Sequence, residues 1–178
     1  MEQKVNVWKA NLNSGLIIGL VGVVYTLLMW FMDLTFNRIQ GYVFFVILIF
    51  LLFYFIRSYR NNYLGGYITY GQAVGAGVII CLISSIIGAI FTYILYVFID
   101  PELSAKQLAF TEELYAKRGM PQEAMDTALN MAKKFQKPLI TAISGILGGV
   151  LFGTIITLIV AIFVRKEGNP LIDTPEVK

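Results

Sequence analysis

Charged side chains divide the chain into four long stretches that contain none, separated by polar segments. The charge-free stretches cover residues 10–32, 39–56, 61–99 and 138–164. A helix needs about 20 apolar residues to cross a bilayer core. Within lipid only a helix satisfies its own backbone hydrogen bonds, so the pattern predicts four transmembrane helices rather than strands. We expect the spans at about residues 14–32, 39–56, 72–99 and 139–164.

The third stretch is too long for a single span. Its 39 residues would extend roughly 58 Å as one helix. The pair Gly65–Gly66 disfavours helix at its start, and the segment Thr69–Gln72 matches a capping box, so we expect the helix to begin near Tyr70. It should end at Asp100–Pro101, because proline restricts the residue before it and cannot extend a helix.

Residues 100–137 form a polar insert between the third and fourth spans. Asp100 can cap a helix that begins at Pro101, and Gly119 can end that helix. Pro121 can open a second one. The sequence therefore predicts an all-α membrane four-helix bundle with a short helical hairpin outside the bilayer core. Residues 1–166 make up this single transmembrane domain, and the segment after it, residues 167–178, is expected to be a disordered tail.

The second helix of the hairpin carries an apolar stripe at helical spacing. One interpretation is that the apolar faces of the hairpin pack on each other or on the membrane surface. The alternative is that the stripe docks a partner, since methionine is common at adaptable binding surfaces. The candidate docking residues are Met125, Met131 and Phe135.

Small residues recur at every fourth position in three of the four spans. Such rows let membrane helices approach closely, so we expect the first, third and fourth spans to form a tight core. A hinge, a dimer face or a lipid groove are the alternative uses of the same glycines. The second span has aromatic side chains instead and is expected on the periphery. The predicted packing residues are Gly15, Gly19, Gly77, Cys81, Ser85, Gly145, Gly149 and Gly153.

Composition agrees with a membrane protein and narrows the chemistry. Hydrophobic residues make up 57% of the chain and charged residues 14%, against about 45–50% and 25% in soluble domains. The net charge of +3 is too small to suggest nucleic acid. There is no histidine, Cys81 is the single cysteine, and no catalytic motif is present. We expect no catalytic, cofactor-binding or metal-binding residues, and partners limited to membrane lipid, a second copy of the chain or another membrane protein.

The orientation rests on the distribution of lysine and arginine. Four spans place both termini on one side, and each side carries seven of these residues, which is a tie for the positive-inside rule. Basic residues in the insert are balanced by acidic ones, so we discount them. Both termini are then expected in the cytoplasm, with an uncleaved first helix, because no small-residue cleavage site follows its long apolar stretch.

Several short segments resemble one protein family when taken in order. They are Tyr70-Gly71-Gln72-Ala73, Phe91-Thr92-Tyr93, Phe98-Ile99-Asp100-Pro101, Arg118-Gly119-Met120-Pro121 and Met131-Ala132-Lys133-Lys134-Phe135. This set is similar to the pattern of the DUF4199 family over about residues 10–165. The resemblance implies a small four-span protein of the inner membrane of Gram-negative bacteria. It supplies no catalytic residues to carry over to this chain, because the family has no established activity.

These observations favour a non-enzymatic role as a structural or accessory subunit of the cell envelope. The alternative is a small transporter or a lipid-handling protein with a groove between the glycine-rich helices. No Asp, Glu, Lys, Arg or His lies inside a predicted span, whereas ion-coupled transporters usually need such a group. A polar cavity near the middle of the membrane would favour the transporter.

Overall fold

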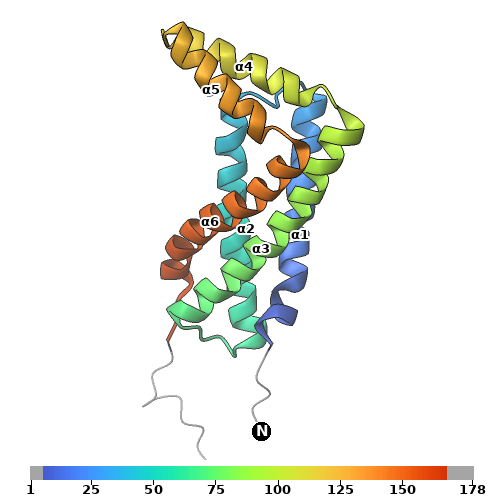
Figure 1. Cartoon of the computed structure of the whole chain (residues 1–178). Coiled ribbons are helices and arrows are strands. Elements are labelled where there is room, and N and C mark those ends of the chain that lie inside the picture. The colour runs from blue at the N-terminus through green and yellow to red at the C-terminus, as the bar shows by residue number, and fades with distance from the viewer. Residues whose placement is uncertain (1–5, 168–178) are drawn as a thin grey trace, which may run out of the picture.

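The computed structural model describes residues 6–167, which fold into six α-helices and one π-helical segment, η1, with no strand element. Figure 1 shows the long helices packed together, with α6 crossing the others at an angle and a helical hairpin at one end. The long helices are α1 (Val7–Phe31), α2 (Arg38–Tyr63), α3 (Tyr70–Ile94) and α6 (Pro138–Val164). Each is long and apolar enough to cross a membrane, with η1 (Leu95–Ile99) extending the third span. The predicted fold class is confirmed. The predicted tail lies almost wholly outside the described residues.

Polar residues fix where the long helices begin. The Asn6 side chain accepts from the backbone N–H groups of Trp8 and Lys9, so α1 starts at Val7, seven residues before Ser14, where the apolar run begins. The predicted capping box at Thr69 and Gln72 is present, with both reciprocal bonds formed. α1 and α2 are therefore longer than the apolar runs at residues 14–32 and 39–56, and their polar ends can continue into the headgroup region.

The insert forms two antiparallel helices, as predicted. They are α4 (Leu103–Lys117) and α5 (Gln122–Phe135), and Gly119 closes the first with a φ of +70°. The expected capping by Asp100 is wrong: α4 begins after Glu102 without a side-chain cap. The Asp100 carboxylate instead binds side chains on two other parts of the chain, as described below.

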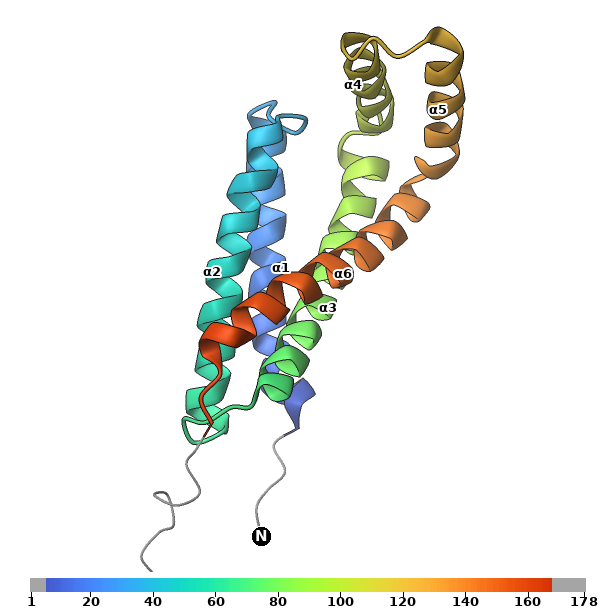
Figure 2. The same cartoon turned by 90° about the vertical axis from the view of Figure 1, so that its left-hand side faces the viewer.

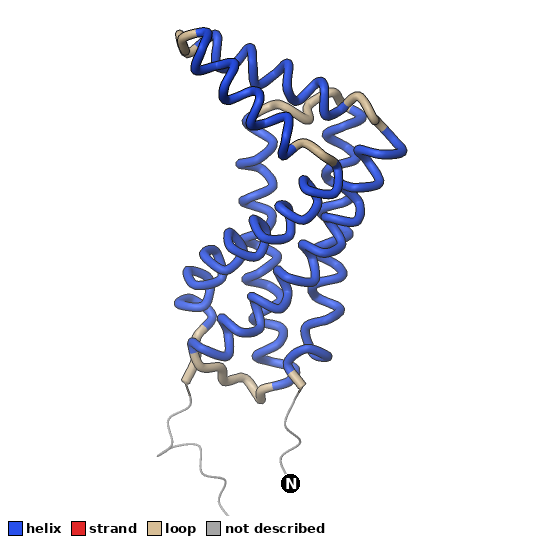
Figure 3. Tube along the Cα trace, in the orientation of Figure 1, coloured by secondary structure: helices blue, strands red, loops and turns tan. Residues whose placement is uncertain are grey.

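The helices are joined by short connections, which Figure 3 shows in tan. Gly65 and Gly66, with φ of +65° and +92°, turn the chain between α2 and α3. Ile68 pairs with Lys166 in an isolated antiparallel bridge, and the Arg60 guanidinium donates to the Val164 carbonyl at 2.9 Å. These bonds fasten the end of α6 to the α2–α3 connection. The start of α1 and the end of α6 therefore lie at the same end of the bundle (Figure 1).

The hydrophobic core lies at that end and in the middle of the bundle. α3 makes most of its contacts with α6 and α1. The expectation that the second span is peripheral is wrong for its C-terminal half: Leu52 and Ile56 are fully buried and Tyr59 nearly so. Its exposed aromatics, such as Phe50 and Tyr54, point away from this core. Figure 2 shows α6 crossing the bundle diagonally and reaching α2 at its far end, which is why this half of α2 is covered.

Candidate functional site

Two antiparallel rows of small residues bring α3 and α6 into close contact. Gly77 faces Thr157, Cys81 faces Gly153, and Ser85 faces Gly149. A Cβ atom at Gly153 would be 2.7 Å from the Cys81 Cβ, and one at Gly149 would be 3.1 Å from the Ser85 Cβ. Both distances are shorter than an ordinary van der Waals contact between carbon atoms. The two backbones can approach this closely only because Gly149 and Gly153 have no Cβ atom.

The contact between α1 and α3 uses a different arrangement. Gly15 and Gly19 form a notch on α1 that receives two branched side chains of α3, Ile83 and Ile87. A Cβ atom at either glycine would be 2.6 Å from the isoleucine that it faces. Here small residues on one helix meet large residues on the other, a pairing that the glycine spacing alone did not indicate.

The row on α6 continues to Gly145, but the contact does not. A Cβ atom at Gly145 would meet nothing within 4 Å, and the same holds at Gly88 on α3. The helices have separated here, and a partly open cavity of about 260 Å³ lies between α1, α2, α3 and α6. Figure 2 shows α3 leaning away from α1 and α2 toward the hairpin end. The walls of the cavity include Gly19, Thr26, Phe44, Ser84, Gly88 and Gly145.

The walls of the cavity are mainly apolar. Two of the hydroxyl groups at the walls bond to their own helices: Thr26 donates to the Gly22 carbonyl at 2.9 Å, and Ser84 donates to the Cys81 carbonyl at 3.0 Å. None of the lining residues carries a charge. Ser85 and Thr92 add two further hydroxyl groups. Most of the cavity surface is nevertheless apolar, so it suits a hydrocarbon chain better than an ion or a sugar.

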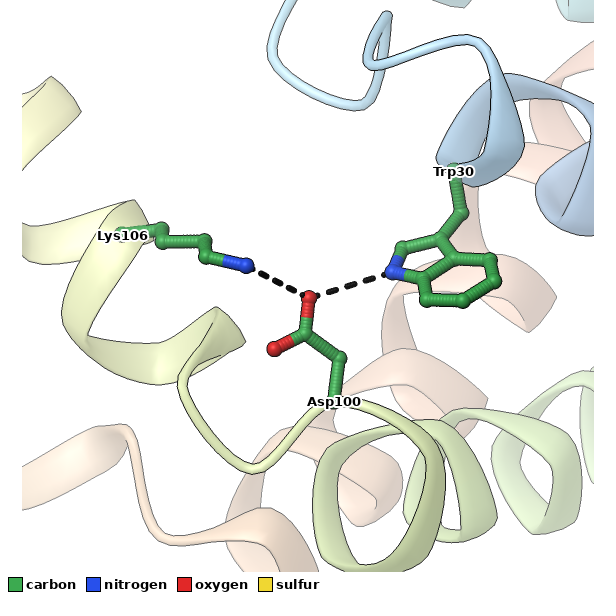
Figure 4. Close-up of polar contacts among 3 residues, drawn as sticks. All are labelled: Trp30, Asp100 and Lys106. Carbon is green, nitrogen blue, oxygen red and sulfur yellow. Dashed lines mark hydrogen bonds and ion pairs between the residues drawn. The ribbon is translucent and has the colours of Figure 1, made fainter.

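A polar cluster lies at the hairpin end of the bundle (Figure 4). One oxygen of the Asp100 carboxylate accepts from the Trp30 indole N–H at 3.1 Å and from the Lys106 ammonium at 2.9 Å. The bond from Lys106, followed by that from Trp30, holds the pKa of Asp100 below its usual value, and Asp100 in turn raises the pKa of Lys106. The cluster links α1 to the junction between η1 and α4.

Two neighbouring contacts fix the hairpin to the bundle in the same region. Phe36, in the connection between α1 and α2, stacks on Phe110 of α4 with ring centroids 5.4 Å apart. The Tyr96 hydroxyl donates to the Gln107 side chain at 3.1 Å. Together with Asp100 these contacts give the start of α4 a defined position, so the hairpin is not a freely mobile arm.

The three candidate docking residues do not lie on one surface. Met125 is buried, at 6% exposure, within α5, a helix whose main neighbour is α4. Met131 and Phe135 are well exposed, at 59% and 63%. Met125 therefore packs in the interior of the hairpin. The large apolar side chains that α5 exposes are in its last two turns.

Sequence reasoning missed two polar residues that matter to this architecture. Asn11 is fully buried on α1, where its amide group donates to the Val7 carbonyl and its Oδ1 atom has no hydrogen-bond partner among residues 6–167. Its spacing of four residues from Gly15 could have placed it on the packing face. Trp30 was not singled out, because its partner Asp100 lies 70 residues away in the chain. Among the described residues no three of the side-chain types that commonly hold metal ions form a group.

A comparison with family models matches residues 13–166 to the family described as "Protein of unknown function (DUF4199)". The match covers α2, α3, α6, the hairpin and all of α1 from residue 13 onward, and it agrees with the resemblance seen in the sequence. No curated protein and no solved structure matches the chain. With the family match spanning most of its length, this multi-pass membrane protein belongs to the DUF4199 family.

Proposed function

We propose that this protein is a non-enzymatic membrane protein that holds the hydrocarbon chain of a lipid in the cavity between α1, α2, α3 and α6. The cavity carries the proposal because it is apolar, partly open, and enclosed by helices that each suit a bilayer. Its volume of about 260 Å³ exceeds the roughly 150 Å³ of an apolar protein cavity that accepts benzene. It is close to the small end of ligand sites, which begin at about 300 Å³.

The chemistry of the walls argues against the transporter alternative. An ion or a polar solute needs side chains that replace its hydration shell, and buried groups without such partners are costly. Here the lining residues are uncharged, and the Thr26 and Ser84 hydroxyls are bonded to their own helices. An acyl chain needs no such partners, and it would fill a space whose lining atoms otherwise lose dispersion contacts.

We also propose that the protein acts as an accessory subunit in the inner membrane of a bacterial envelope. A lipid held between the helices is compatible with such a role, because it could stabilise a subunit within a larger assembly. The four long apolar helices support the membrane address in its coarse form, a multi-pass membrane protein.

The experiment fills the cavity without disturbing the helix contacts. Gly88→Leu places a large side chain at a cavity wall where a Cβ meets nothing within 4 Å. Gly75→Leu is the matched control, a glycine of the same helix that is equally open but does not line the cavity. Native mass spectrometry of the full chain, purified in mild detergent, should show a retained phospholipid in the wild type and in Gly75→Leu. Gly88→Leu should lose it.

Two results would overturn the proposal. One is a wild-type protein that retains no lipid at any detergent concentration that keeps it folded. The other is equal retention by Gly88→Leu and the wild type, which would place the lipid on the outer surface. A photoreactive group near the end of the acyl chain adds a direct readout, since it should cross-link to residues near Thr26 and Phe44 at the cavity walls.

A further inference from the structure

The last two turns of α5 carry two large apolar side chains that are mostly exposed, Met131 at 59% and Phe135 at 63%. Met125 and Leu129 are the buried residues of this helix, whose main neighbour is α4. A residue two positions later in a helix lies about 200° further around the axis. Met131, two residues after Leu129, is thus on the opposite side of α5, and Phe135 is one turn beyond it. These side chains form a second apolar stripe rather than the edge of the α4 contact.

This second stripe lies next to the membrane-spanning part of α6. The Thr141 hydroxyl, in the first turn of α6, is 3.4 Å from the Phe135 carbonyl and donates to it. The end of α5 is therefore at the level where α6 begins. Beyond it, α6 exposes large apolar side chains at the same four-residue spacing, and each is half exposed or more. They include Leu139, Ile143, Leu147 and Leu151.

The exposed basic residues of α5 lie at its end next to α6, and its exposed acidic residues lie at the other end, a distribution that favours contact with phospholipid headgroups at the α6 end. Lys133 and Lys134 are exposed in the last turn, next to α6, and Lys137 follows in the connection. The acidic residues Glu123 and Asp126 are exposed at the opposite end of the helix, away from α6. Lysine side chains can lie along apolar surface while their ammonium groups reach lipid phosphates.

We propose that the last two turns of α5 lie in the headgroup region of the bilayer, with Met131 and Phe135 inserted at the edge of the hydrocarbon and Lys133 and Lys134 at lipid phosphates. A short amphipathic segment of this kind is bound by buried apolar area and by charge together. The stripe is too small for a stable protein interface, which buries about 800 Å² on each partner. The hairpin then contacts the membrane surface through the end of α5 and is fixed to the bundle through α4. This proposal is independent of the lipid cavity.

The test measures the depth of single labelled positions in the full chain. In a Cys81→Ser background, Met131→Cys, Phe135→Cys and Gln122→Cys each receive a small fluorophore. Gln122 is the control, because it is exposed at the end of α5 away from α6. The labelled proteins are reconstituted in vesicles of phosphatidylcholine and phosphatidylglycerol. Quenching is then compared between lipids brominated on the acyl chain and aqueous iodide.

Positions 131 and 135 should be quenched severalfold more by brominated lipid than position 122, and severalfold less by iodide. Equal iodide quenching at all three positions would overturn the proposal, because the stripe would then face water. A second result would also overturn it: positions 131 and 135 are protected from both quenchers, and the protection disappears when the protein is diluted in the membrane. A second copy of the chain would then cover the stripe. Met131 is 59% exposed, so Met131→Cys should not disturb the fold. Position 131 therefore gives the result even where Phe135→Cys does not fold.

Discussion

Gly153 of α6 lies directly against Cys81 of α3, so close that a Cβ atom on the glycine would be 2.7 Å from the Cβ of the cysteine. The pair sits in the middle of the antiparallel contact, between Gly77–Thr157 on one side and Ser85–Gly149 on the other. Lipid provides no hydrophobic drive for helices to associate, so close dispersion contacts of this kind are what hold α3 to α6.

The first prediction concerns this contact. Gly153→Ala should destabilise the protein by about 1–3 kcal/mol, because the added methyl group overpacks a contact in which a backbone or a short side chain must move. Gly148→Ala is the matched control on the same helix, since a Cβ there meets nothing within 4 Å. The control should be neutral or more stable by up to about 1 kcal/mol, as alanine favours helix over glycine. Thermal unfolding in detergent measures both. Equal effects at the two positions would contradict the packing argument.

The second prediction separates the two bonds to Asp100. Asp100→Ala should destabilise the protein by about 1.5–3 kcal/mol, because a hydrogen bond to a charged, largely covered group is lost and the Trp30 N–H keeps no protein acceptor. Lys106→Ala should destabilise the protein much less than Asp100→Ala, because water screens an ion pair whose lysine side chain is 52% exposed. Denaturant unfolding of the purified variants gives both values. A larger effect at Lys106 than at Asp100 would mean that the ion pair, not the indole bond, fixes the hairpin.

The third prediction follows from the lowered pKa of Asp100, which its bonds to Lys106 and Trp30 cause. A carboxyl group with a lower pKa in the folded state stabilises that state above its unfolded pKa, about 3.9 for aspartate. That stability is lost as the pH falls through the folded pKa. The difference in unfolding free energy between the wild type and Asp100→Asn should therefore be constant above about pH 5 and shrink in more acidic solution. A difference that grows on acidification would show that the sign is wrong.

The fourth prediction tests the orientation, which the charge count leaves nearly balanced. Asn62 and Gln122 are exposed at opposite ends of the bundle, near the α2–α3 connection and in the hairpin. Single cysteines at these positions, in a Cys81→Ser background, are probed in intact spheroplasts with a thiol reagent that does not cross membranes. Labelling at position 122 alone would agree with both termini in the cytoplasm. Labelling at position 62 alone would reverse the orientation.

Local features of the sequence were sufficient for the elements themselves. Charge-free runs predicted the four long helices, and the capping box at Thr69 and the glycine at position 119 marked two helix ends that the structure contains. These features depend on backbone hydrogen bonding and φ angles within a few residues, so they can be read from neighbouring positions alone.

Contacts between elements were less accessible to sequence reasoning. The row of small residues on α6 is regular from Gly145 to Gly153, yet Gly149 and Gly153 meet α3 while Gly145 borders an open cavity. Periodicity identifies a face of a helix but not where two helices that cross at an angle begin to separate. The burial of Leu52 and Ile56 on α2 depends in the same way on the diagonal path of α6.

The sequence by itself determined the number of helices, the hairpin between the third and fourth spans, and the faces able to pack closely. Tertiary structure alone decided which apolar surface meets protein and which meets lipid, because in a membrane both are apolar and polarity does not distinguish inside from outside. It also decided the pairing of Trp30 with Asp100, 70 residues apart. That bond forms because the packing of α1 against α3 brings the end of α1 near the end of η1.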